Sequence, residues 1–227
     1  MDLPVAVAGD LDSWLDNFET AQKEPLSAGY QASTWLFEHP EITLVVKVAP
    51  NTGLRKYLLG LTLKHEYQVY KKLQGVAGVP KCYGLYKDRF LVLEYIQGQT
   101  LREREPADHD YFYLRLLQLI KEIHKRGVMH VDLKRKDNIL VVNHREPYLI
   151  DFGVAVIVRQ WYRPLNRFLL NLGKRYDYNA WVKHKYNRRY DLASPEDQKY
   201  LQHTFSERVA RFFKQNTKKL LRSIRSK

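Results

Sequence analysis

Cysteine is almost absent from this chain, which contains only Cys82. A single cysteine cannot form a disulfide within the chain, and this suits a reducing compartment such as the cytosol. Long apolar runs are absent too, since no stretch reaches the roughly 18 residues that a membrane-spanning helix needs. The first residues, MDLPVAVAGDLD, lack the basic start and the apolar stretch of a secretory signal. We therefore expect a cytoplasmic protein.

Acidic residues are scarce in the last third of the chain. Residues 159–227 contain 18 Lys and Arg but only 5 Asp and Glu, so they carry the whole net charge of +13. Residues 1–158 contain 20 residues of each sign and are neutral. A positive field of this kind attracts anionic partners, such as a membrane surface, a nucleic acid, or an acidic or phosphorylated substrate.

The apolar pattern predicts an α+β chain in which most strands precede most helices. The expected elements are a helix over 10–24 with Asp12 or Ser13 as N-cap, a strand over 41–50, a helix over 61–75, two strands within 78–101 joined at Lys87 and Asp88, a helix over 110–127, and a hairpin-like strand pair formed by 138–142 and 147–153. Beyond residue 155 the chain is helical in character. We expect a sheet-rich first lobe, residues 1–94, and a mainly helical second lobe, residues 95–227.

Five short motifs, in this order and at these spacings, resemble those of the protein-kinase-like superfamily. They are VVKVA (45–49), KHEYQVY (64–70), LVLEYIQG (91–98), MHVDL followed by DNIL (129–133 and 137–140), and DFG (151–153). Any one of them recurs by chance, but their order over residues 25–155 does not. The resemblance implies a two-lobed kinase-like fold, with an antiparallel-sheet N-lobe and a compact, mainly helical C-lobe.

The same resemblance implies catalytic roles for four residues. Lys47 would bind the α- and β-phosphates of ATP, and Glu66 would hold Lys47 in place. Asp132 would accept the proton of the acceptor hydroxyl, and Lys134 would reach the γ-phosphate. A transferring phosphoryl group carries charge that must be positioned and neutralised, which explains why these residue types are needed.

The resemblance also implies that ATP and Mg²⁺ are the cofactors. Asp151 and Asn138 would bind Mg²⁺, which prefers carboxylate, carbonyl and phosphate oxygens. Backbone groups of Glu94 and Ile96 would contact adenine. Residues 27–36, LSAGYQASTW, contain Gly29 but not the G-x-G-x-x-G pattern. Their backbone N–H groups could surround phosphate, or they could form an ordinary hairpin turn.

The catalytic-loop motif is one residue longer than the usual pattern. The usual loop has its asparagine five residues after the aspartate, whereas Asn138 follows Asp132 by six and Asp137 occupies the fifth position. We expect the extra residue to form a bulge within KRKD (134–137), with Asn138 as metal ligand and Asp137 as its substitute. Val131 replaces the loop arginine, which implies no control by phosphorylation of an activation loop.

No A-P-E motif follows DFG, and the second lobe is short. The segments GVPKCYG, LEYIQGQTL, PYLIDFG and residues 163–189 are similar to small bacterial lipopolysaccharide-core sugar kinases and RIO-type atypical kinases. This implies transfer of the γ-phosphate to a sugar hydroxyl of a lipopolysaccharide-core-like acceptor at the inner membrane. The alternatives are a RIO-like Ser/Thr protein kinase and a pseudokinase that serves as a binding module.

Residues 159–190 alternate cationic and aromatic side chains. They could form the core of the second lobe with solvated charges, or a peripheral surface for anionic lipid, with aromatics at headgroup depth. An anionic acceptor, either a lipid-linked sugar or a protein, fits the same charge. Nucleic acid also fits the charge, but no recognised DNA- or RNA-binding motif is present, so we do not expect it as a partner.

Overall fold

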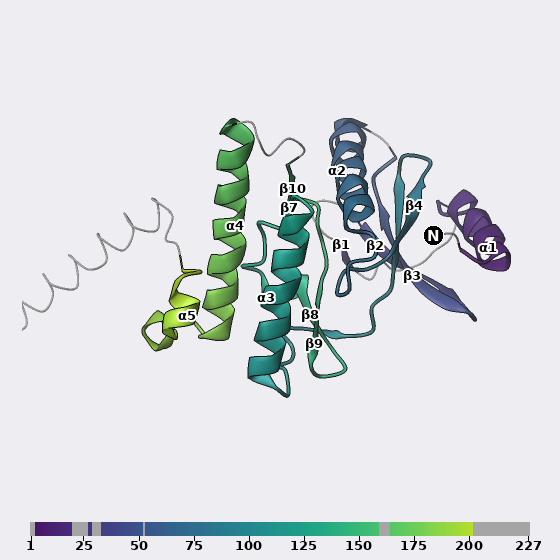
Figure 1. Ribbon diagram of the computed structural model, residues 1–227. Helices are drawn as coiled ribbons and strands as arrows, with labels where there is room; N and C mark the ends of the chain where they lie inside the picture. The colour runs from purple at the N-terminus through teal and green to yellow at the C-terminus, as the bar shows by residue number, and fades with distance from the viewer. Residues whose placement is uncertain (1–2, 20–26, 29–32, 52, 159–163, 202–227) are drawn as a thin grey trace, which may run out of the picture.

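The computed structural model describes residues 3–19, 27–28, 33–51, 53–158 and 164–201. Its first part is an antiparallel sheet of five strands in the order β1-β2-β3-β5-β4 (Figure 1). The strands are β1 (Ser27–Ala28), β2 (Ser33–His39), β3 (Ile42–Val48), β4 (Cys82–Tyr86) and β5 (Phe90–Glu94). Lys87 and Asp88 both have positive φ angles between β4 and β5, as the predicted turn requires.

Two helices cover opposite faces of this sheet (Figure 1), α1 (Val5–Asp16) and α2 (Gly53–Leu73). Successive side chains of a strand point to opposite faces, so each strand serves both cores. Leu91 and Leu93 pack in the core that contains α2, whereas Val92 packs in the core that contains α1. On β3, Val46 is buried on the α1 side, and Lys47 therefore points toward α2.

The predicted N-cap of the first helix was wrong, and residues 20–24 of its predicted range lie outside the described residues. The helix begins at Val5 and ends at Asp16, so Asp12 and Ser13 lie inside it rather than at its N-cap. The Ser13 hydroxyl donates to the carbonyl of Gly9, as serine does within a helix. The buried residues of α1 are spaced four apart and form one apolar face toward the sheet; they are Val7, Leu11 and Leu15.

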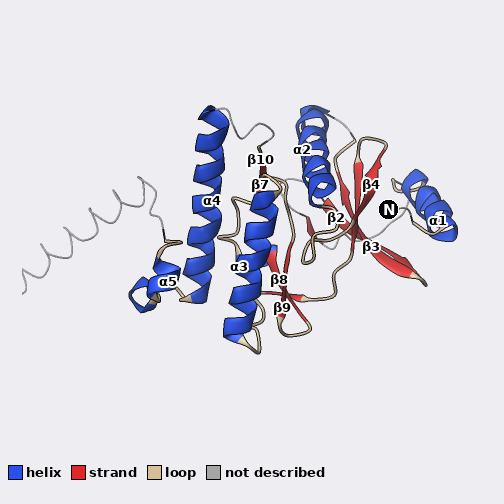
Figure 2. Ribbon diagram, viewed as in Figure 1, coloured by secondary structure: helices blue, strands red, loops and turns tan. Residues whose placement is uncertain are grey.

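The second part of the molecule is mainly helical (Figure 2), and its two long helices are α3 (His109–Lys125) and α4 (Pro164–Lys185). Short strands lie beside them: β6 (Gln99–Thr100), β8 (Ile139–Val142) and β9 (Glu146–Leu149) form one sheet, and β7 (Val128–Met129) pairs with β10 (Val156–Ile157). The remaining elements are the 3-10 helices η1 (Lys136–Asn138) and η2 (Tyr190–Leu192), and helix α5 (Pro195–Gln198).

Helix α3 shows how closely local signals fix an element. Asp108 is its N-cap and accepts a hydrogen bond from the backbone N–H of Tyr111 at 3.0 Å. Gly127 follows its end with a φ of +71°. The predicted range of 110–127 therefore agrees with the structure to within two residues at each end. Helix α2 begins eight residues before the predicted start at 61.

The α+β composition and the separation of sheet from helices confirm the predicted two-lobed architecture. The lobe boundary at residues 94 and 95 stays a prediction; β5 ends at Glu94. Within the described ranges, none of the helices combines the length and the apolar character needed to cross a bilayer.

Candidate active site

A buried lysine between two carboxylates lies where the sheet meets α2. The Lys47 ammonium is 2.6 Å from a carboxylate oxygen of Glu66 and 2.9 Å from one of Asp151. Burial alone would lower the pKa of Lys47, but the two carboxylates outweigh it, and the net effect raises that pKa. Burial would likewise raise the pKa of Asp151, and the charge of Lys47 lowers it instead. Lys47 and Asp151 are therefore both charged at neutral pH.

Tyr70, one helical turn after Glu66, packs against the DFG motif. Its side chain is buried. Its ring contacts Phe152 edge-on at 5.2 Å, and Phe152 in turn contacts His130 at 4.7 Å. Asp151 has a φ of +63°, which a residue other than glycine adopts only when its surroundings fix it. The ion pair with Lys47 and the packing of the adjacent Phe152 hold Asp151 in this conformation.

The catalytic-loop motif accommodates its extra residue in a 3-10 turn. The N–H of Arg135 donates to the carbonyl of Asp132 at 3.3 Å, and η1 follows at residues 136–138. This turn brings Asn138 back beside Asp132. The Asn138 side-chain amide donates to both the backbone carbonyl and a carboxylate oxygen of Asp132, each at 3.1 Å. The predicted bulge in 134–137 thus leaves Asn138 next to the predicted base.

Asp137 has a different partner. Its two carboxylate oxygens accept hydrogen bonds from Arg102 at 2.6 and 2.8 Å, in a bidentate pair. The hydrogen bond from Arg102 is the main reason that the pKa of Asp137 is lowered. Asp137 therefore joins the loop to the segment before α3, and the position next to Asp132 belongs to Asn138.

Asp177 on α4 anchors the loop backbone, and the sequence analysis did not identify it. One of its oxygens accepts from the N–H of His130 at 2.9 Å and from the ring of His124 at 2.8 Å, and the other accepts from the N–H of Val131 at 2.8 Å. Its side chain is fully buried. One signal was available: Asp177 is the single acidic residue among nine Lys and Arg in residues 159–190.

A cavity of about 520 Å³ opens between these groups. Lys47, Asp151 and Asn138 line one end, and Glu94 and Ile96, the predicted adenine contacts, line another part of its wall. This volume lies within the range usual for cofactor sites. Gly29, the predicted phosphate-binding glycine, lies outside the described residues.

The residues at the end of the cavity suit a magnesium ion that is shared with a nucleotide. Asp151 supplies a carboxylate, and Asn138 uses its amide nitrogen on Asp132, which leaves the amide oxygen as its ligand atom. Among the described residues, no group of three His, Cys, Asp or Glu side chains could form a metal site. Mg²⁺ is commonly bound by only one or two protein carboxylates together with substrate phosphates, so the two ligands fit.

Lys47 contacts both Glu66 on α2 and Asp151 after the catalytic loop. This arrangement is typical of a kinase-like nucleotide site. Comparison with known families agrees, because a sequence model of the protein kinase domain matches residues 39–173. The chain therefore belongs to the protein kinase domain family.

The chain is also similar to individual serine/threonine kinases. Serine/threonine-protein kinase D of Synechocystis sp. is 29% identical over 156 residues, 62% of this chain and 30% of that protein. Casein kinase II subunit alpha' of Saccharomyces cerevisiae is 28% identical over 133 residues, 53% of this chain and 38% of that protein. Serine/threonine-protein kinase KIC1 of the same yeast is 34% identical over 107 residues, 43% of this chain and 10% of that protein. The match thus spans less than two fifths of each relative.

Proposed function

We propose that this protein is an ATP- and Mg²⁺-dependent phosphotransferase that acts on an alcohol group. The observation that carries the proposal is the Lys47 ammonium between Glu66 and Asp151, at the end of a cavity of nucleotide size. Asp132 and Asn138 lie together on the adjacent loop. A pseudokinase is less well supported, because the chain has all four charged groups that phosphoryl transfer uses: Lys47, Glu66, Asp132 and Asp151.

Each residue has a role in this proposal. Lys47 binds the α- and β-phosphates, and Glu66 orients it. Asp151 and Asn138 would hold Mg²⁺, which would neutralise phosphate charge. Backbone groups of Glu94 and Ile96 contact adenine, and a phosphate-binding role for Gly29 stays a prediction from the sequence.

In the transfer step, one bond to the γ-phosphorus forms as another breaks. The acceptor oxygen forms a bond to the γ-phosphorus while the bond from that phosphorus to the β–γ bridging oxygen breaks, and ADP leaves. Asp132 accepts the hydroxyl proton. Lys134, whose ammonium lies 5.2 Å from the centre of the Tyr176 ring, follows Asp132 by two residues and meets the γ-phosphate. The charge that develops is neutralised by cations that are already in position.

The acceptor that we propose is a sugar hydroxyl of a lipopolysaccharide-core-like molecule. Only six residues, 158–163, connect β10 with α4, so little chain is available for a peptide-binding segment. The second candidate is a Ser or Thr hydroxyl of a protein, as in RIO-type kinases, and the similarity to serine/threonine-protein kinases favours it. A phosphotransferase is common to both.

We also propose that the protein acts in the cytoplasm at the inner membrane, where such an acceptor would be presented. The exposed Phe168 of α4 supports lipid contact by residues 159–190. Trp181 does not, because it is buried and donates from its ring N–H to the carbonyl of Tyr113 at 2.7 Å. Trp161 and Tyr162 lie outside the described residues. The described part of residues 159–190 therefore contains both a buried aromatic side chain, Trp181, and an exposed one, Phe168.

The test is phosphate transfer from γ-labelled ATP with Mg²⁺, using lipopolysaccharide and a whole-cell protein extract as separate acceptors. The wild type is compared with Asp151→Ala. Label in lipopolysaccharide that disappears in the variant supports the sugar acceptor, and label in protein under the same control supports the second candidate. No label in either fraction, together with no thermal stabilisation by Mg²⁺-ATP, would reject a phosphotransferase.

A further inference from the structure

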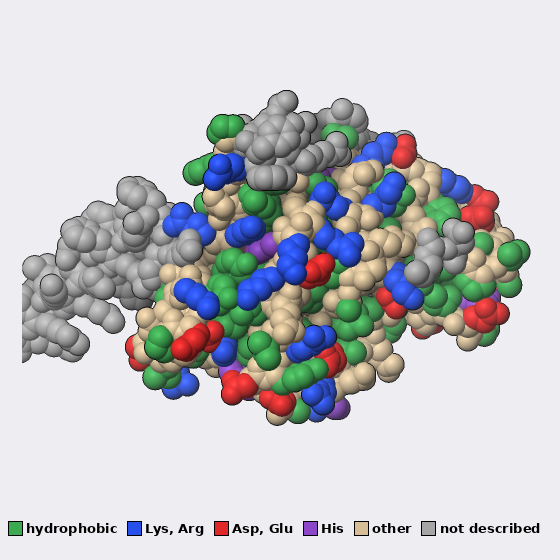
Figure 3. Space-filling view, viewed as in Figure 1, with side chains coloured by type: hydrophobic (Ala, Val, Ile, Leu, Met, Phe, Trp, Pro, Cys, Tyr) green, Lys and Arg blue, Asp and Glu red, His purple; other side chains and the backbone are tan. Residues whose placement is uncertain are grey.

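Four cationic side chains gather beside the catalytic loop, and we call them the basic cluster: Lys134, Lys136, Lys183 and Arg188. Lys134 and Lys136 belong to the loop, and Lys183 and Arg188 belong to the end of α4 and the turn after it. In the part of the chain that the structure describes, none of the four lines the nucleotide cavity. Figure 3 shows many Lys and Arg side chains, with few acidic ones, across the middle of one face.

The end of α4 is attached to the loop next to the proposed base. The Lys183 ammonium donates to the carbonyl of Lys134 at 2.9 Å, and the ring Nε2–H of His184 donates to the carbonyl of Leu133 at 2.8 Å. Leu133 and Lys134 are the two residues that follow Asp132. The basic cluster therefore lies next to the place where an acceptor hydroxyl would meet Asp132.

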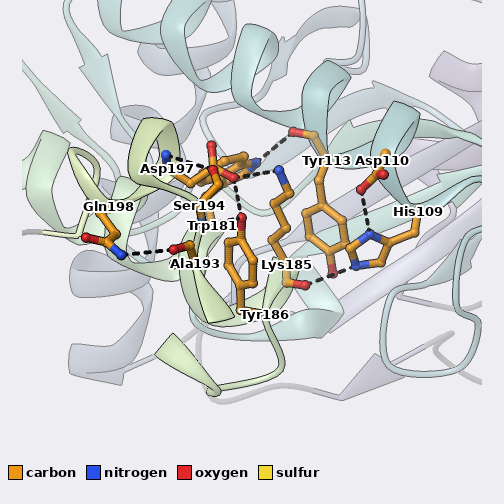
Figure 4. A network of polar contacts seen from close by, with 10 residues as sticks. All are labelled: His109, Asp110, Tyr113, Trp181, Lys185, Tyr186, Ala193, Ser194, Asp197 and Gln198. Carbon is orange, nitrogen blue, oxygen red and sulfur yellow. Dashed lines mark hydrogen bonds and ion pairs between the residues drawn. The ribbon is translucent and has the colours of Figure 1, made fainter. Parts of the chain in front are cut away.

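The turn after α4 fixes the position of Arg188. Its N–H donates to the carbonyl of Lys183 at 3.0 Å, and both Asn187 and Arg188 have positive φ angles, 50° and 66°. The two residues just before this turn are held by Asp197, which accepts hydrogen bonds from Lys185 and from the hydroxyl of Tyr186, each at 2.6 Å (Figure 4).

Two cations of the basic cluster have no carboxylate partner among the described residues. Lys136 pairs with Glu105 at 3.1 Å, but among the described residues no carboxylate forms an ion pair with Lys183 or Arg188. Burial lowers the pKa of Lys183, and the positive charges of Arg188, Lys134 and Lys136 lower it further. Mutual repulsion of this kind is relieved when an anion binds, and a phosphate group offers both two negative charges and several acceptor oxygens.

We propose that the basic cluster binds a phosphate group carried by the acceptor, so that the acceptor is a phosphorylated sugar. This deepens the proposed function and rests on it, since the cluster is defined by its place beside Asp132. The phosphate positions the acceptor, and a neighbouring hydroxyl of the same sugar, or of the next one, reaches the base. The short connection of six residues between β10 and α4 favours a sugar over a phosphopeptide.

The experiment is a titration of the full chain, saturated with Mg²⁺-ADP, with glucose 6-phosphate, glucose and a phosphoserine peptide, followed by calorimetry at low salt. The variants are Arg188→Ala and the charge-conserving Arg188→Lys. Lys125→Ala is the matched control, because Lys125 is 76% exposed on α3 and pairs only with Glu122 among the described residues. We expect glucose 6-phosphate to bind at least about fivefold more tightly than glucose, and 0.3 M salt to weaken it.

Arg188→Ala should weaken glucose 6-phosphate binding about three- to tenfold, Arg188→Lys should restore most of it, and Lys125→Ala should leave it within about twofold. Equal affinity for glucose and glucose 6-phosphate, or wild-type affinity in Arg188→Ala, would overturn the proposal. Tighter binding of the phosphoserine peptide would overturn the sugar class. A separate melting experiment with Mg²⁺-ATP tests the nucleotide site. If Mg²⁺-ATP does not stabilise the protein but glucose 6-phosphate still binds to nucleotide-free protein, the proposed function is rejected. Phosphate binding by the basic cluster is then still supported.

Discussion

Replacing Asp177 with asparagine should both destabilise the protein and misplace its catalytic loop. The carboxylate accepts three hydrogen bonds, from two backbone N–H groups of the loop and from His124, and it is fully buried. An asparagine has only one side-chain acceptor oxygen. If that oxygen keeps the bonds from His130 and His124, the amide nitrogen faces the N–H of Val131, and that bond is lost.

The magnitude follows from these three bonds. A lost bond to a buried charged group costs about 1.5–3 kcal/mol, and the two retained bonds weaken by about 1 kcal/mol each once the charge is gone, so we expect about 3–5 kcal/mol. Val131 has a φ of +58°, a strained conformation for a β-branched residue. Without the bond from its N–H it relaxes, and Asp132 moves with it.

Urea unfolding gives the stability change, and ATP turnover gives the effect on the site. The control is Asp191→Asn, since Asp191 is exposed and belongs to the short helix η2; it should change the free energy of unfolding by less than about 0.5 kcal/mol. A loss below about 1 kcal/mol in Asp177→Asn, with wild-type turnover, would refute the reasoning, because the anchoring bonds would then carry little energy.

Three further predictions follow from the structure. Tyr70→Ala removes a buried ring that contacts Phe152 edge-on at 5.2 Å, so the free energy of unfolding should fall by about 3–5 kcal/mol; unchanged stability in urea unfolding would contradict this. Gly173→Ala should destabilise the protein by about 1–3 kcal/mol, because the new Cβ would lie 2.8 Å from Met129. Gly60→Ala is the control and should stabilise the protein by about 0.5–1 kcal/mol, because no atom of the described residues lies within 4 Å of its Cβ position. Equal effects of the two variants in thermal unfolding would be inconsistent with the packing. Burial lowers the pKa of His184 from 6.5 to about 4, so between these pH values the unfolded chain binds a proton that the folded chain excludes. The free energy of unfolding should therefore fall by up to about 3 kcal/mol as the pH drops from 6.5 to 4. His184→Gln should remove this pH dependence in urea unfolding, and an unchanged pH profile in the variant would count against it.

Local signals in the sequence were sufficient for the elements and for much of the candidate site. Apolar periodicity that ends at Gly127 predicted α3, and the order of motifs predicted that Lys47 and Glu66 would meet across 19 residues. The same reasoning failed for α1, because Asp12 and Ser13 suit an N-cap although the buried face begins before them. Cap residues also occur inside helices, where only burial distinguishes the two cases.

Contacts between distant segments could not be predicted in the same way. Asp177 meets the catalytic loop across 46 and 47 residues, and nothing in its own neighbourhood shows which backbone N–H groups it accepts. Tyr70 has the pattern of an ordinary core residue of α2, and its ring contact with Phe152 depends on how the two lobes pack. The cations at the end of α4 were recognised as excess charge, but their position beside Leu133 and Lys134 required the fold.

The most direct test of the central claim compares the wild type with Asp132→Asn. Transfer of labelled phosphate from ATP to the acceptor is measured together with Mg²⁺-ATP binding for both proteins. Our account predicts that the variant binds Mg²⁺-ATP with near wild-type affinity, because Lys47 and Asp151 are untouched, while transfer falls at least about a hundredfold with the loss of the base. Unchanged transfer in the variant, or a wild type that binds no Mg²⁺-ATP, would contradict it.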